Sequence, residues 1–355
     1  MAVAALALVS AAGAAPCPGV ARADGFDTAR LCAVMQDFGA DPANYHSLLV
    51  ERHGVLAAEL YRRGSDRSIY SLMRHTVTFG PGDRHDLRSI SKSVTSLLWG
   101  IAQAQGKVPP VDTPVATLLP ELADLRGGAR GKITVAHLLG MSSGLAWNEP
   151  GVYNRITDET GLYWRSAPAR YVLERPILAA PGTQFQYNGG STAVIAEILA
   201  QRIGMPLDEY ARRNLFEPLG ITDWEWQRDL HGRPLAFAGL RMRPRDLLKL
   251  GRLVLQQGQW DGRQIVPAGW LDESLRPRLA TGDGLRYGYQ WWAGQVKVGD
   301  QSYAWSGALG NGGQRLFVVP KLDLAVVVTA GEYDDSTVGP RLNRLLRSIV
   351  TAAVR

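Results

Sequence analysis

Strand-forming segments occur at both ends of this chain, and this distribution restricts the fold more than any other feature of the sequence. Near the start, residues 45–64 have the alternation of a β-hairpin, with His53 and Gly54 in the turn. Near the end, β-branched and aromatic residues gather in runs separated by turn residues, at 287–292, 303–305, 314–319 and 324–329. A final amphipathic helix is expected over 339–354.

The middle of the chain, from about residue 112 to 275, has helical periodicity interrupted by Pro and Gly. The clearest helices are expected at 135–139, 192–202, 207–215 and 245–257. Strands on both sides of a helical region predict an α+β fold, with an antiparallel sheet built from N- and C-terminal strands and flanked by helices. We therefore expect one domain over 24–355, with a sheet subdomain (about 45–110 and 280–355) and a mostly helical inserted subdomain (about 111–279).

Within the first residues, Met1 to Ala23, the stretch Ala2 to Ala15 is uninterruptedly apolar or small, and Ala21-Arg22-Ala23 supplies an A-x-A pattern; together they are typical of a secretory signal peptide. This predicts a periplasmic or secreted protein, with a buried helix or a retained anchor as the alternatives. The segment is too short to span a membrane, so we expect no stable membrane insertion after its removal. Cleavage after Ala23 would remove Cys17 and leave only Cys32, so no disulfide is expected.

Composition excludes several kinds of partner. The formal net charge is +6, but the basic residues are scattered among acidic ones without a run of like charge, which gives little support to nucleic-acid binding. No group of Cys and His has the spacing of metal ligands, so neither a metal nor an organic cofactor is expected.

A helix that begins at Ser89 and ends near Gly106 carries the most reactive pair of residues. Ser89 and Lys92 are three residues apart and therefore share a face of this helix. A serine hydroxyl becomes a nucleophile when a base removes its proton, and a lysine can be that base if burial lowers its pKa. Lys92 lies in an otherwise uncharged segment, which favours burial. The alternative is an N-cap serine followed by a solvated lysine.

Two glycine-containing stretches could complete this site. Tyr187 lies in a Gly-rich turn over 181–190; near a lysine ammonium we expect its pKa to fall, so that it could pass protons to a leaving group. The alternative is a tyrosine packed in the core. Residues 305–314 are glycine-rich beside a strand, where a backbone N–H could form an oxyanion hole with that of the nucleophile. A glycine-rich hairpin is the alternative.

In this order, the serine, lysine, tyrosine and glycine-rich strand resemble the serine β-lactamase and penicillin-binding-protein superfamily, and within it the class C-like esterases and 6-aminohexanoate-oligomer hydrolases. The resemblance extends over most of the chain after about residue 45, and further stretches support it at 112–120, 133–145, 216–220 and 318–324. It implies that Ser89 is acylated, Lys92 is its base and Tyr187 shuttles protons. It also implies an oxyanion hole made by the N–H groups of Ser89 and Ala308.

This sequence departs from the family pattern at two motifs. Where the third motif usually reads Lys-Thr-Gly, the chain has Trp305, Ser306 and Gly307, and the resemblance places Trp305 at the site. The missing lysine would otherwise bind a substrate carboxylate. Its loss argues against β-lactams and favours an uncharged or apolar acyl group, unless Arg241 or Arg243 replaces it.

The second motif is commonly Tyr-x-Asn. Here Gly189 stands in place of the asparagine, and Asn188 comes one residue early. We therefore expect Asn188 to contribute to substrate binding, if it takes over that part.

We predict a serine hydrolase that cleaves a small ester or amide, with an ester slightly favoured. One alternative is a sensor domain of the same fold that is acylated without turnover; another is β-lactamase or D-alanyl peptidase activity. Ser142, in the G-x-S-x-G sequence at 140–144, is a competing nucleophile. That motif requires a preceding strand, whereas a helical pattern precedes Ser142.

Overall fold

Strands from the two ends of the chain pair side by side in one large sheet. The computed structural model describes residues 17–22, 25–71, 73–149 and 157–354. In the eight-stranded antiparallel sheet β1 pairs with both β15 and β2, and the order is β10-β11-β12-β13-β14-β15-β1-β2. The strands are β1 (Tyr45–Arg52), β2 (Val55–Tyr61), β10 (Leu279–Ala280), β11 (Arg286–Tyr287), β12 (Trp292–Val298), β13 (Gln301–Gly310), β14 (Gln314–Val319) and β15 (Leu324–Ala330). The predicted α+β fold is confirmed.

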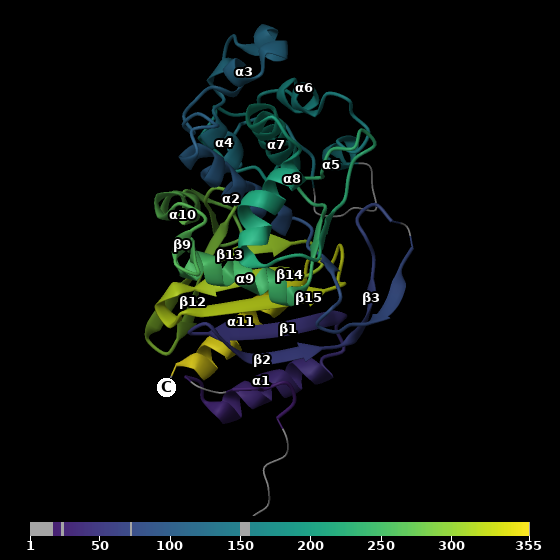
Figure 1. Ribbon diagram of the computed structural model, residues 1–355, viewed down its shortest axis with the longest axis vertical. Helices are drawn as coiled ribbons and strands as arrows, with labels where there is room; N and C mark the ends of the chain where they lie inside the picture. Colours follow the sequence, from purple (N-terminus) through teal and green to yellow (C-terminus); the bar gives the residue numbers. More distant parts are fainter. Residues whose placement is uncertain (1–16, 23–24, 72, 150–156, 355) are drawn as a thin grey trace, which may run out of the picture.

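Helices cover both faces of this sheet, and therefore its central strands are apolar on both sides. Leu48, Leu49 and Val50 of β1 are all fully buried. On one face α1 (Thr28–Ala40) and α11 (Val338–Ala353) build a core with the sheet. On the other face lie α2 (Ile90–Ala104) and α9 (Pro244–Leu255). Figure 1 shows the sheet between α1 and the helical region.

The N-terminal segment corrects one expectation. Cys17 and Cys32 form a disulfide that ties residues 17–22 to α1. The same segment lies along the outer edge of β2, where the Glu59 N–H donates to Gly19 O at 2.7 Å and the Ala21 N–H donates to Ala57 O at 2.9 Å. The prediction of no disulfide is wrong for the chain that keeps these residues, since they pair with the sheet. The remainder of the predicted signal peptide, 1–16 and Ala23, lies outside the described residues.

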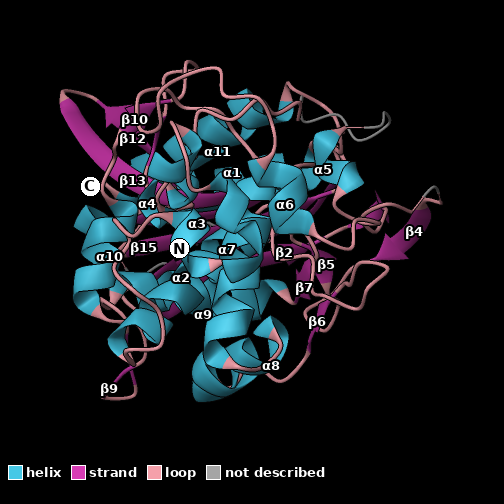
Figure 2. Cartoon of the chain, turned by 90° about the horizontal axis from the view of Figure 1, so that it is seen from above, coloured by secondary structure: helices cyan, strands magenta, loops and turns pink. Residues whose placement is uncertain are grey.

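The helical region sits above the sheet, as Figure 2 shows from the top. Its elements are α3 (Val115–Leu118), α4 (Val135–Leu139), α5 (Asp158–Gly161), α6 (Pro168–Leu173), α7 (Gly189–Ile203), α8 (Leu207–Ala211) and α10 (Ala268–Leu275). Although α9 belongs to the range assigned to the helical subdomain, it packs directly on β14 and β15 at Gly251, where a Cβ would meet Leu316 and Ala325.

Short strands were missed by the sequence analysis because each contains only a few residues. They are β3 (Arg63–Asp66), β4 (His75–Thr78), β5 (His85–Asp86), β6 (Trp224–Trp226), β7 (Leu240–Met242), β8 (Gln259–Trp260) and β9 (Arg263–Gln264). The run 287–292 was expected to form one strand, but it forms a turn between β11 and β12. Within it the Gly288 N–H donates to Trp291 O at 2.8 Å, and Gln290 has a φ of +66°.

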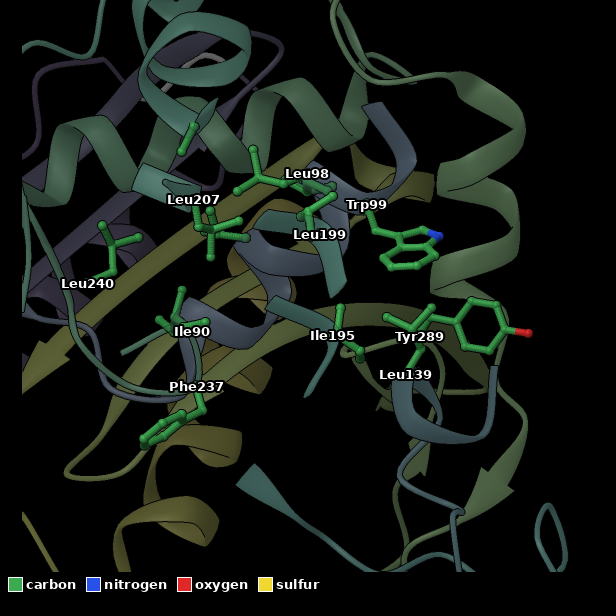
Figure 3. Packing of buried hydrophobic residues seen from close by; sticks show 14 of the residues in the cluster. Ile90, Leu98, Trp99, Leu139, Ile195, Leu199, Leu207, Phe237, Leu240 and Tyr289 are labelled. Carbon is green, nitrogen blue, oxygen red and sulfur yellow. The ribbon is translucent and has the colours of Figure 1, made fainter. Parts of the chain in front are cut away.

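Helix α2 passes through the middle of the molecule. Every residue from Ile90 to Ala102 is buried, and Leu98 and Trp99 pack in one apolar cluster with residues of α7, such as Ile195 (Figure 3). A side chain on the first turn of α2 is therefore held deep in the protein. Among the described residues, no helix has the length and apolarity to cross a membrane.

Candidate active site

A strained turn places Ser89 at the start of α2. Arg88, immediately before it, has a φ of +50°, a conformation that costs free energy for a residue with a Cβ. Contacts around the turn compensate for this cost. The Arg88 guanidinium lies 4.4 Å from the centre of the Tyr333 ring, and its Nη2 donates to Arg67 O at 2.6 Å. Ser89 is 5% exposed and lines a cavity.

Lys92 is buried beside the serine, as the sequence predicted. Its Nζ lies 3.1 Å from Ser89 Oγ and donates to Phe237 O at 2.8 Å. The side chain is 1% exposed, so the amine is held in one orientation. The alternative of a solvated surface lysine is therefore wrong.

Tyr187 lies close to both Ser89 and Lys92, just before α7. Its ring centre is 4.9 Å from Lys92 Nζ, and its hydroxyl shares a hydrogen bond with the Ser89 side chain. Burial raises the pKa of Tyr187 well above its usual range, and the charge of Glu149 raises it further. The expected fall in its pKa is therefore wrong, because desolvation outweighs the hydrogen bond. Tyr187 is a phenol at neutral pH, able to donate a proton.

Two buried carboxylates beside Lys92 were missed by the sequence analysis. Glu149 Oε1 lies 3.9 Å and Glu159 Oε2 3.6 Å from Lys92 Nζ, with side chains 2% and 0% exposed. A Cβ built on Gly189 would lie 2.5 Å from Glu159 Oε2 and 3.0 Å from Glu149 Oε2. The glycine that replaces the family's asparagine was the available signal, because it leaves room for these carboxylates.

Ser89, Glu149 and Tyr187 open into a cavity of about 470 Å³. Trp292 forms part of its wall, with its ring centre 5.8 Å from that of Tyr187. The end of β13 and the following turn contribute further lining at Leu309, Gly310, Asn311 and Gly312. In the sequence, Trp292 was part of the strand-forming run at 287–292 and was not expected at the site.

The structure does not bring the predicted third motif to this cavity. Trp305 packs edge-on against Phe317, at 5.0 Å between ring centres, in the core under α1 and α11. Its predicted place at the site is wrong, because the ring is buried in that core and is not part of the described cavity lining. Ser306, Gly307 and Ala308 lie on β13 outside the described cavity lining, and the oxyanion role of Ala308 stays a prediction.

Asn188 caps α7 instead of facing the cavity. Its Oδ1 accepts from the Ser191 N–H at 3.0 Å, and its side chain is buried. This is the usual role of an asparagine at a helix N-cap. The expected contribution of Asn188 to substrate binding finds no support in this geometry.

The described cavity lining does not include Arg241 or Arg243, which were considered as replacements for the missing lysine, or the competing nucleophile Ser142. Arg241 pairs with Glu225 at 3.2 Å, and Arg243 pairs with Asp246 at 2.7 Å. The cation on the cavity wall is Arg315, whose Nη1 donates to the carbonyls of Gly310 and Gln314. Ser142 follows the helix α4 and not a strand, with Oγ 3.4 Å from His137 O, so it lacks the setting of a nucleophile elbow.

The described residues contain no group of three or more His, Cys, Asp or Glu arranged to hold a metal ion. The cavity wall supplies the hydroxyl of Ser89, the phenol of Tyr187 and the carboxylate of Glu149, and the amine of Lys92 lies 3.1 Å from the hydroxyl.

Known proteins are similar to this chain over most of its length. The Beta-lactamase family matches residues 47–350, so the chain belongs to the β-lactamase family, a superfamily of serine hydrolases. The chain is 28% identical over 311 residues to the 6-aminohexanoate-dimer hydrolase of Paenarthrobacter ureafaciens, covering 82% of this chain and 74% of that protein.

Solved structures show the same fold at low sequence identity. The class C beta lactamase from Rhodobacter sphaeroides superposes with a TM-score of 0.66 at 16% identity, over 93% of this chain and 99% of that one. A family VIII carboxylesterase superposes with a TM-score of 0.68 at 15% identity, over 91% and 97% of the two chains.

Proposed function

We propose that this protein hydrolyses a small ester or amide through an acyl-enzyme on Ser89. The observation that carries the proposal is the 3.1 Å contact between Lys92 Nζ and Ser89 Oγ at the wall of a cavity. A buried amine next to a hydroxyl is the arrangement that activates a serine nucleophile. The retained pair argues against a domain that merely binds, since binding requires no base.

In this mechanism Lys92, as the neutral amine, takes the Ser89 proton while Oγ attacks the acyl carbon. The N–H groups of Ser89 and Ala308 bind the oxygen that becomes negative. Tyr187 donates its phenol proton to the leaving alcohol or amine and regains one from Lys92, whose Nζ lies 4.9 Å from the ring centre. Water then hydrolyses the acyl-enzyme.

The substrate class follows from the cavity wall. Trp292, Leu285, Leu309 and Val338 supply apolar surface. The charged residues of the described lining are the acidic Glu149, Asp283 and Asp335 and the basic Arg315, so acidic groups predominate. A substrate carboxylate would be placed near a like charge, which supports an uncharged acyl group and argues against β-lactams. Similarity to the family VIII carboxylesterase supports an ester as the substrate, and similarity to the 6-aminohexanoate-dimer hydrolase supports an amide as the alternative.

The test is the initial rate of the purified protein on p-nitrophenyl acetate and butyrate, beside Ser89→Ala and Ser142→Ala. We expect turnover that Ser89→Ala abolishes and Ser142→Ala leaves unchanged. Equal turnover in wild type and Ser89→Ala would overturn the assignment of the nucleophile. A single equivalent of nitrophenol without turnover would indicate the acylated sensor instead.

We also propose that the protein acts in the periplasm or outside the cell. The leader-like start supports this, and so does the Cys17–Cys32 disulfide, since disulfides persist in oxidising compartments. Because residues 19–21 pair with β2, the leader would end before Cys17, where Ala12-Gly13-Ala14 offers a second A-x-A pattern. The intact mass of the exported protein should include Cys17; a mature chain starting at residue 24 would refute this.

A further inference from the structure

We infer that Glu149 is a further catalytic residue, whose carboxylate accepts a proton from the water that hydrolyses the Ser89 acyl-enzyme. The inference rests on the proposed function, because it requires an acyl group on Ser89. It adds a role for a side chain that the Ser89, Lys92 and Tyr187 set leaves unused.

One carboxylate oxygen of Glu149 accepts two hydrogen bonds, and the other accepts none from the described residues. Oε2 accepts from Trp147 Nε1 at 2.8 Å and from the Gly189 N–H at 2.6 Å. Oε1 is buried, lies 3.9 Å from Lys92 Nζ, and has no hydrogen-bond partner among the described residues. Glu149 also lines the cavity with Ser89 and Tyr187. A buried oxygen of this kind is costly unless a water donates to it.

Gly189 explains why a carboxylate occupies this place. The family's asparagine would project from this position, but here its space is filled by Glu149 and Glu159 oxygens. An amide can orient a water molecule but does not take its proton, whereas a carboxylate does both. The exchange of asparagine for glycine therefore adds a proton acceptor to the neighbourhood of Lys92.

The proton balance of this step closes within the site. Water oxygen bonds to the acyl carbon while its proton passes to Glu149 Oε1. The tetrahedral intermediate then collapses, the bond from the carbon to Ser89 Oγ breaks, and the acid product leaves. Glu149 passes the proton taken from water to the amine of Lys92 across 3.9 Å, and the ammonium so formed donates one to Oγ, 3.1 Å away. The enzyme returns to its starting protonation.

The experiment separates acylation from deacylation in the full chain. Stopped-flow release of nitrophenol from p-nitrophenyl acetate gives the burst, which reports acylation, and the steady-state rate that follows, which reports deacylation. Glu149→Gln keeps an oxygen for Trp147 and Gly189 but removes the base. We expect the burst to persist at near one equivalent, the steady-state rate to fall roughly 100-fold or more, and an acetyl adduct to accumulate in the intact mass.

Glu159→Gln is the matched control, because it removes an equal charge at 3.6 Å from Lys92 Nζ, and Glu159 is not part of the described cavity lining. We expect it to change the burst and the steady-state rate together. A Ser89 adduct that clears equally fast in Glu149→Gln and wild type would overturn the role of Glu149 alone. So would a burst that slows as much as turnover does. Absence of any Ser89 adduct in wild type and variants would instead overturn the proposed function itself.

Discussion

Gly189→Ala tests the packing of the carboxylates beside Lys92. The added methyl group would lie 2.5 Å from Glu159 Oε2 and 3.0 Å from Glu149 Oε2, closer than such atoms approach. Glu149 cannot retreat freely, since Oε2 is held by two N–H groups, and Glu159 is fully buried. Overpacking of this kind costs about 1–3 kcal/mol, of which the better helix propensity of alanine recovers about 0.5–1 kcal/mol.

Two assays measure the outcome. Urea unfolding should show a net loss of about 1–2 kcal/mol at unchanged slope. The rate on p-nitrophenyl acetate should fall about 100-fold, because a displacement near 1 Å in a catalytic group has that effect. The control is Gly269→Ala in the first turn of α10, where nothing lies within 4 Å of the added carbon. This variant should be as active as wild type and at least as stable.

A double-variant cycle identifies the cause of the loss. Glu159→Ala removes the oxygen at 2.5 Å, so adding Gly189→Ala to it should cost at least about 1 kcal/mol less than adding it to wild type. If Gly189→Ala were as stable and as active as wild type, the carboxylates would not be confined as the structure has them. The account of the glycine would then be refuted.

Three further measurements test other parts of the structure. Cys32→Ser opens a disulfide with a sequence separation of 15 and should lower the free energy of unfolding by about 3 kcal/mol; no change would show that the disulfide does not tie the N-terminal segment to α1. Burial lowers the pKa of His46 to about 4, against 6.5 unfolded, so stability should fall by up to about 3 kcal/mol as the pH drops through that interval. His46→Gln should flatten this dependence, and an unchanged slope would contradict it. Burial also raises the pKa of Tyr187, so kcat/KM should show no loss from tyrosine ionisation up to about pH 10, and an alkaline fall that Tyr187→Phe removes would contradict this.

Much of the fold followed from the order of strand and helix patterns along the chain. The hairpin at 45–64, the strands at 314–319 and 324–329 and the last helix are confirmed, because these segments are long and periodic. The run 287–292 was misjudged, since aromatic residues favour strands whether or not a turn interrupts them. Its turn depends on Gln290, whose side-chain Nε2 donates to the Leu139 carbonyl of α4 at 3.0 Å, a contact invisible in local sequence.

In the site, too, the residues fixed by local sequence were predictable and those brought in by tertiary structure were not. Ser89 and Lys92 were predictable because both lie on one helix, where three residues of separation fix their distance. Glu149 and Glu159 were not, because a loop and a short helix bring them to Lys92 from about sixty residues away. The direction of Tyr187's pKa was misjudged for the same reason, since the neighbouring carboxylate and the burial come from tertiary structure.

The two departures from the family pattern change the charge of the site in the same direction. The third motif loses its lysine, and Trp305 turns into the core under α11 instead of facing the cavity. The second motif loses its asparagine side chain, and Glu149 and Glu159 fill its space. One change removes a cation and the other adds anions, so both weaken the attraction of the site for a substrate carboxylate. A variant that restored only the lysine at position 305 would place its ammonium in the apolar core that Trp305 now fills beside Phe317, and not on the described cavity wall.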